Sequence, residues 1–240
     1  MPAVFVHGVP DTAAMWKPLL AKLKRHDVMP LALPGFGNKR PEGFAPTKES
    51  YVAWLIAELK RIDGPIDLVG HDWGSLLVTR AVSLRPELVR TWCAGAAPLH
   101  HDYVWHDTAK IWQTPGQGED FMKLFAGEPV AQALMSQGQT KETAHEAASH
   151  IDDEMKTCIL TLYRSAVNAS AEWYPDLKHA PNKALILWGE QDAFAAPKFG
   201  ELLARDTSGK FHLMRGCGHW YPTQDPDAMA AALEHHWASQ

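Results

Sequence analysis

Asp72, Asp192 and His219 are residues whose types could carry out nucleophilic chemistry, and each follows a predicted buried strand. Asp72 is the centre of GHDWG (70–74), where glycines flank a polar residue between an apolar run and a helix-like run. This setting is typical of the sharp strand-to-helix turn that exposes a nucleophile. Such a site also needs a histidine base and an acid that orients the histidine. We therefore expect Asp72 to be the nucleophile, His219 its base and Asp192 the orienting acid.

Each of these residues also has a structural interpretation. Asp72 could be a turn aspartate that bonds its own backbone, and His219 could be a histidine packed near a turn. Glu190 stands two residues before Asp192 and is the alternative acid. The chain order nucleophile–acid–histidine, with each residue at a strand end, favours the catalytic interpretation.

The elements that would position these residues alternate between strand and helix. Apolar runs predict strands at 3–8, 66–70, 88–95, 183–189 and 209–214, and a further strand in 27–37 that breaks into a Pro/Gly loop. Amphipathic stretches predict helices at 11–25, 47–61, 74–85, 197–205 and 225–238. This alternation predicts an α/β fold, with a mostly parallel sheet and helices on both faces.

The alternation stops after Pro98. Residues 99–178 contain no convincing strand but have helical patterns at 103–112, 119–126, 128–137 and 141–167. We therefore expect residues 1–98 and 179–240 to form the core domain, and residues 99–178 to form an inserted helical cap.

Composition excludes several classes of protein. The chain has 240 residues and a net charge of −5, with 46% hydrophobic and 21% charged residues. It has no basic stripe for nucleic acid and no apolar run of about 18 residues for a membrane span. MPAVFVHG lacks the basic start of a signal peptide. Three scattered cysteines suggest reduced thiols and hence a cytoplasmic protein. Both a monomer and a homodimer are compatible with the sequence.

Two histidine-rich stretches suggest metal sites at first sight. HHDYVWHD (100–107) fits no standard ligand spacing. HEAASH (145–150) is one residue longer than the zinc motif HExxH, so its histidines would lie about 140° apart on a helix. We predict no metal and no organic cofactor.

Four motifs, HGVP (7–10), GHDWG (70–74), GEQD (189–192) and GCGHW (216–220), resemble the α/β-hydrolase superfamily, in the branch of epoxide hydrolases and haloalkane dehalogenases. The resemblance implies an α/β-hydrolase fold with an inserted cap. Because the first strand runs directly into HGVP, we expect a shortened sheet of about six strands.

The resemblance also implies a mechanism. Asp72 would form an alkyl ester with a small apolar substrate, and water activated by His219 would then attack that ester. The backbone N–H groups of Val9 and Trp73 would form the oxyanion hole, and each such donor is worth roughly 3–4 kcal/mol of barrier. Water would be the co-substrate.

Two observations favour an epoxide as the electrophile. Val9 stands where many dehalogenases have an asparagine that binds the halide, and CAGAAPL (93–99) lacks the carboxylate that one dehalogenase group carries there. We expect an epoxide hydrolase that converts an apolar epoxide to a vicinal diol. A haloalkane dehalogenase and a non-catalytic ligand-binding protein are the alternatives.

The cap tyrosines of the epoxide hydrolase pattern are only half matched. Tyr163 falls about where the second one is expected, although it could also be a core residue. The expected window for the first, 117–130, has Phe121 and Phe125 but no tyrosine. Its role could fall to one of several earlier residues: Tyr103 from a rearranged cap, Trp105, His106 or Trp112. We expect Tyr103, Trp105 and Trp112 to line the substrate pocket, with core packing as the alternative for each tryptophan.

Overall fold

The centre of the molecule is one parallel sheet. The computed structural model describes residues 1–240, with strands Ala3–Val6 (β1), Val28–Leu31 (β2), Ile66–Gly70 (β3), Val89–Ala94 (β4), Ala184–Gly189 (β5) and Lys210–Met214 (β6). Their order in the sheet is β2-β1-β3-β4-β5-β6, and every neighbouring pair is parallel. The expected sheet of about six mostly parallel strands is therefore confirmed.

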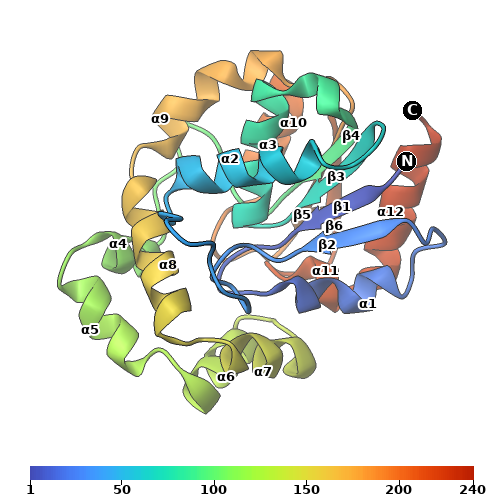
Figure 1. Ribbon diagram of the computed structural model, residues 1–240. Helices are drawn as coiled ribbons and strands as arrows, with labels where there is room; N and C mark the ends of the chain where they lie inside the picture. The colour runs from blue at the N-terminus through green and yellow to red at the C-terminus, as the bar shows by residue number, and fades with distance from the viewer.

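Helices cover both faces of this sheet (Figure 1). One face is covered by α2 (Lys48–Leu59), α3 (Trp73–Leu84) and α10 (Lys198–Asp206), and the other by η1 (Ala13–Trp16), α1 (Lys17–Leu20), α11 (Tyr221–Gln224) and α12 (Pro226–Ala238). The residues of β1 alternate between the two resulting cores, because successive strand side chains point to opposite faces. Val4 and Val6 belong to the first core, and Ala3 and Phe5 to the second.

A helical segment, residues 95–183, connects β4 to β5 and is called the β4–β5 segment here. Its helices are α4 (Asp107–Gln113), α5 (Gln117–Leu124), α6 (Gly127–Ser136), α7 (Lys141–Ser149), α8 (Asp153–Ser165), α9 (Ala169–Trp173) and η3 (Tyr174–His179). The short η2 (Pro86–Leu88) precedes β4. Figure 1 shows α4 to α8 on the lower left of the molecule, away from both chain ends. The assignment of residues 99–178 as a separate cap stays a prediction.

Three predicted helix boundaries were wrong. The single helix expected at 141–167 is two helices, because the Asp152 side chain accepts the Met155 N–H at 2.8 Å and caps a new helix. The helix expected at 103–112 begins at Asp107, where His106 is the cap. The helix expected at 11–25 is only η1 followed by α1, which ends at Leu20.

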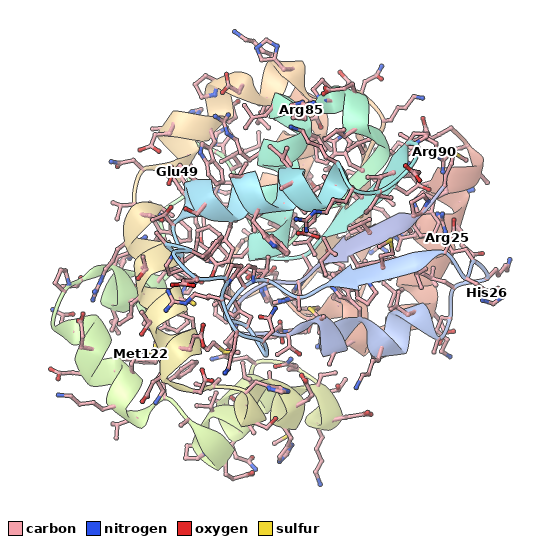
Figure 2. The ribbon with its side chains drawn as sticks, in the orientation of Figure 1. Arg25, His26, Glu49, Arg85, Arg90 and Met122 are labelled. Carbon is pink, nitrogen blue, oxygen red and sulfur yellow. The ribbon has the colours of Figure 1, made fainter.

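The carboxyl ends of the strands and the opposite end of the sheet carry different polar groups. At the amino ends, the buried Asp67 carboxylate accepts hydrogen bonds from Arg25 and Arg90 at 2.8 Å, and both arginines lie near the chain termini (Figure 2). Asp72, Asp192 and His219 all follow the carboxyl ends of their strands. No helix combines the length and apolar character needed to span a bilayer.

Candidate active site

Asp72 lies on a strained turn between β3 and α3. Its backbone has φ 53° and ψ −124°, a conformation that L-residues rarely adopt and that costs of order 1–3 kcal/mol. The turn requires glycines on both sides, because a Cβ at Gly70 would lie 2.4 Å from the Gly74 carbonyl oxygen, and one at Gly74 would lie 2.0 Å from the Val6 carbonyl oxygen. The Asp72 N–H donates to the Gly95 carbonyl at 3.1 Å. The tight turn therefore presents the carboxylate beyond the sheet edge.

Asp72, His219 and Asp192 come together as the sequence order suggested. Nδ1 of His219 lies 3.0 Å from Oδ2 of Asp192, and Nε2 of His219 lies 3.6 Å from Oδ2 of Asp72. The other Asp192 oxygen accepts the N–H groups of Phe194 and Ala195 at 2.9 and 3.1 Å. Glu190, the alternative acid, instead accepts the Gly216 N–H at 2.8 Å. The carboxylate that contacts His219 is therefore that of Asp192.

The charges of this trio support one another. Burial on its own would lower the pKa of His219, but the carboxylates of Asp192 and Asp72 outweigh burial and raise this pKa to about 10. Burial on its own would raise the pKa of Asp72, but His219 and the Val9 N–H lower it. The two neighbouring carboxyl groups therefore favour the protonated form of His219 in the free protein.

One of the two N–H groups predicted for the oxyanion hole contacts this carboxylate. The Val9 N–H donates to Oδ1 of Asp72 at 2.8 Å. Gly8 allows this approach, because a Cβ there would lie 2.3 Å from the same oxygen. His7 fixes the loop by bonding the Gly8 carbonyl at 2.8 Å and accepting the Leu33 N–H at 3.0 Å. The Trp73 N–H makes no hydrogen bond to the Asp72 carboxylate.

Two chambers meet at Asp72. The larger chamber has a volume of about 240 Å³, and most of its lining is apolar, from α4, α5 and α6. The smaller chamber has a volume of about 20 Å³ and is lined mainly by residues 96–106 and α3. Asp72, His106, Tyr163 and Phe194 line both.

The predicted aromatic residues are distributed between these chambers. Tyr163 lines both chambers, Tyr103 and Trp105 line the smaller one, and Trp112 lines the larger one. The Tyr163 ring contacts Trp73, Trp105 and Trp112, with ring centroids 4.8–5.6 Å apart. Burial raises the pKa of Tyr163 and of Tyr103, and the negative charge of Asp72 adds to this, so both hydroxyls stay protonated.

The position of His106 in both chambers was not predicted, although its type had marked it as a substitute donor. Its Nδ1 accepts the Ala109 N–H at 3.2 Å as the cap of α4, so the neutral ring carries its proton on Nε2. Burial lowers the pKa of His106, which keeps the ring neutral. His106 is therefore a further hydrogen-bond donor beside Asp72.

Hydrogen bonds join the residues on either side of His219 to the connection between α6 and α7, and nothing in the sequence predicted them. The buried Asp11 carboxylate accepts Trp220 Nε1–H at 3.0 Å and Gln139 Nε2–H at 2.7 Å. Gln224 accepts the Gly218 N–H and donates to the Gly138 carbonyl, both at 2.7 Å. The connection between α6 and α7 is therefore tied to both neighbours of His219. Asp11 follows HGVP directly, but nothing in the sequence links it to Gln139.

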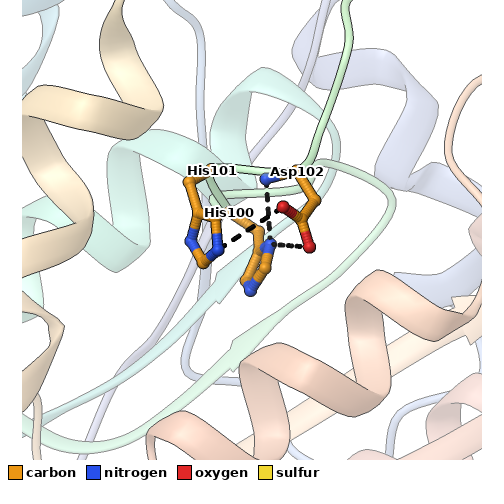
Figure 3. Close-up of side chains that lie close together, drawn as sticks. All are labelled: His100, His101 and Asp102. Atoms are coloured by element: carbon orange, nitrogen blue, oxygen red, sulfur yellow. Dashed lines mark hydrogen bonds and ion pairs between the residues drawn. The ribbon is translucent and has the colours of Figure 1, made fainter.

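Neither histidine-rich stretch forms a convincing metal site. His100, His101 and Asp102 lie close together in the loop after β4 (Figure 3), with donor atoms within 4.8 Å of one another. However, Nδ1 of His100 already accepts the Asp102 N–H at 3.1 Å, and the other two side chains are exposed. His145 and His150 pair with different carboxylates, of Glu128 and Glu146. We assign no metal to either stretch.

Comparisons with known proteins agree with this architecture. The model of the alpha/beta hydrolase family matches residues 3–232. Epoxide hydrolase 2 of Caenorhabditis elegans is 23% identical, over 96% of this chain and 72% of that protein, and epoxide hydrolase 4 of Mus musculus is 23% identical, over 98% and 71%. A solved haloalkane dehalogenase of Bradyrhizobium elkani has a TM-score of 0.78 at 19% identity, covering 100% of this chain and 91% of that chain, a likeness that shows the fold alone. Because the family model spans nearly the whole sequence, this chain belongs to the alpha/beta hydrolase family.

Proposed function

We propose that this hydrolase opens an apolar epoxide through a covalent ester on Asp72 and releases a vicinal diol. The observation that carries the proposal is the contact of Asp72 with both the His219–Asp192 pair and a chamber lined by two tyrosines. The similarity to epoxide hydrolases over nearly the whole chain supports the same choice. We also propose that the β4–β5 segment acts as the cap over this site.

In the first step, Oδ2 of Asp72 attacks an epoxide carbon and the bond from that carbon to the ring oxygen breaks. The ring oxygen takes a proton from the hydroxyl of Tyr163 or Tyr103, which line the smaller chamber. The remaining Asp72 oxygen, Oδ1, keeps its hydrogen bond from Val9. The product of this step is a hydroxyalkyl ester of Asp72.

Formation of the ester changes the charge around His219. Asp72 becomes neutral, so one of the two carboxylates that raise the pKa of His219 is lost. His219 can then pass its proton to the tyrosinate and become neutral. The base for the second step is thus created by the first step.

In the second step, neutral His219 removes a proton from water, and the resulting hydroxide adds to Cγ of Asp72. Negative charge develops on Oδ1, which the Val9 N–H stabilises. The tetrahedral intermediate then breaks its bond to the alkyl oxygen, and this oxygen takes the proton from His219. The proton left on the Asp72 carboxyl group moves to His219, which restores the starting carboxylate and imidazolium. Asp192 holds the imidazole in the required tautomer throughout.

A direct assay tests the proposal. The purified protein is incubated with styrene oxide, and phenylethanediol is measured by chromatography against an enzyme-free control. Wild type should form the diol, and Asp72→Asn should form none, whereas Asp107→Asn, which changes an exposed aspartate at the start of α4, should match wild type. His219→Gln should accumulate the ester, visible as an adduct by intact-protein mass spectrometry. Equal activity of Asp72→Asn and wild type would contradict the proposal.

Dehalogenation is the second candidate, because two indoles line the smaller chamber. Trp73 and Trp105 stack with ring centroids 6.0 Å apart, and indole N–H groups are suitable donors to a departing halide. Halide release from 1-bromohexane, compared with diol formation from styrene oxide at the same enzyme concentration, separates the two. Halide release without any diol formation would replace the epoxide proposal with this one.

A further inference from the structure

The two chambers differ about twelvefold in volume and meet at the Asp72 carboxylate, at about 240 and 20 Å³. A substrate that reaches Asp72 can therefore place atoms in both chambers. The volume and the lining of each chamber decide which part of a substrate it can hold.

The smaller chamber has room for a single oxygen atom. A void needs about 10–15 Å³ to hold one water, so about 20 Å³ holds one oxygen and no ring or chain. Its apolar walls include Leu76, Ala97 and Pro98, which are buried, so they cannot move apart without disturbing the core. Tyr103 and Tyr163 are among its lining residues, and the Tyr103 hydroxyl donates a long hydrogen bond to the Phe194 carbonyl at 3.4 Å. A tyrosine hydroxyl is a suitable donor to an oxygen that gains negative charge.

The larger chamber suits an apolar arm. A cavity of about 150 Å³ with apolar walls binds benzene, so about 240 Å³ holds a phenyl ring with a short linker. Phe121, Phe125, Val130 and Leu134 supply apolar walls. Leu124 also lines it and is 84% exposed, so the chamber reaches the protein surface at this residue. A longer arm could extend to the surface there.

We infer that the substrate is a terminal epoxide with one apolar arm, whose oxygen occupies the smaller chamber while the arm occupies the larger one. This inference rests on the proposed function. In a displacement at carbon, the leaving oxygen lies opposite the attacking Asp72 oxygen. Once the ring oxygen fills the smaller chamber, a second substituent on that side has no space. We therefore expect the other positions on the epoxide ring to carry hydrogen, because a substituent directed with the ring oxygen toward the smaller chamber would not fit.

A set of three epoxides tests the inference with the wild-type protein. Styrene oxide has one arm, trans-β-methylstyrene oxide adds one methyl group on the opposite carbon, and trans-stilbene oxide adds a second ring there. We expect kcat/KM to fall at least tenfold for the added methyl group and to become undetectable for the added ring. Equal kcat/KM for all three epoxides would overturn the inference while leaving the proposed function in place.

Two matched variants locate the effect in the smaller chamber. Leu76 and Leu77 are neighbouring buried residues of α3, but only Leu76 lines the chamber. Leu76→Ala should raise the ratio of trans-β-methylstyrene oxide to styrene oxide turnover at least threefold. Leu77→Ala, which removes the same atoms from the core, should leave this ratio unchanged. An equal change in both variants would contradict the role of the chamber.

A third variant tests the larger chamber. Val130 is buried and lines it, so Val130→Phe should lower kcat/KM for styrene oxide at least tenfold and leave propylene oxide, which has only a methyl arm, within twofold. An equal loss for both substrates would overturn the assignment of the arm. Failure of wild type to hydrolyse any epoxide overturns the proposed function itself, an outcome distinct from hydrolysis without size preference.

Discussion

Substituting Asp72 with Asn should lower the pKa of His219 from about 10 to near neutrality. The amide imitates the neutral ester, since both remove the negative charge next to His219. Nε2 of His219 lies 3.6 Å from the Asp72 carboxylate, and the two side chains are only 6% and 17% exposed. Coulomb's law with an effective dielectric constant of about 20 gives about 4.6 kcal/mol at 3.6 Å, roughly 3 pKa units. The pKa of His219, raised to about 10 by Asp192 and Asp72 against the effect of burial, should therefore fall to roughly 7.

The assay is an NMR pH titration of protein labelled at histidine, with the His219 signal assigned by its loss in His219→Gln. Wild type should show no titration of His219 between about pH 6 and pH 9, and Asp72→Asn should show a midpoint in this range. Asp107→Asn is the control and should leave the signal as in wild type. Circular dichroism confirms that each variant is folded. A midpoint in Asp72→Asn within about one unit of wild type would refute the electrostatic coupling on which the second step depends.

Three further predictions follow from the site and its supports. Tyr163→Phe and Tyr103→Phe should each lower kcat for epoxide opening about tenfold or more, with little change in KM, because each removes a donor to the ring oxygen. Steady-state kinetics measures both constants. An unchanged kcat in both variants would contradict the donor roles. Gly74→Ala should lower the free energy of unfolding by about 1–3 kcal/mol or more, because its Cβ would lie 2.0 Å from the Val6 carbonyl oxygen. Urea titration measures this change. Gly218→Ala is the control and should stay folded, because its Cβ would meet nothing within 3.5 Å. Burial raises the pKa of Asp11 from 3.8 to about 6, so its contribution to stability is present at low pH and is lost as pH rises to about 6. The free energy of unfolding of Asp11→Asn should therefore fall less than that of wild type between about pH 4 and pH 7, by about 2 kcal/mol, and identical slopes would contradict this.

The sequence was most informative about the reactive residues that directly follow a strand. Asp72, Asp192 and His219 each follow a strand with a clear apolar pattern, and parallel strands bring their carboxyl ends to one edge of the sheet. The sheet and the contacts among these residues were therefore predictable. The Val9 contact was predictable from the resemblance alone, because nothing in the spacing of HGVP indicates which N–H points at Asp72.

The β4–β5 segment was the least predictable part. Its helices pack by side-chain shape, and local caps such as Asp152 decide where one helix ends and the next begins. Tyr103 belongs to a stretch without regular structure, so its place in the smaller chamber depends on the path of the loop after β4. The hydrogen bond from Gln139 to Asp11 joins positions 128 residues apart, and no periodicity of the sequence predicts such a pair.

The most direct test of the account is a single turnover in oxygen-18 water with enzyme in excess over styrene oxide. If Asp72 is esterified and water attacks its Cγ, the label enters the Asp72 carboxylate and the diol from this first turnover is unlabelled. Mass spectrometry of the peptide that contains Asp72, and of the diol, measures both. Label in the diol, with none in the Asp72 peptide, would mean that water attacks the epoxide directly and would contradict the covalent mechanism.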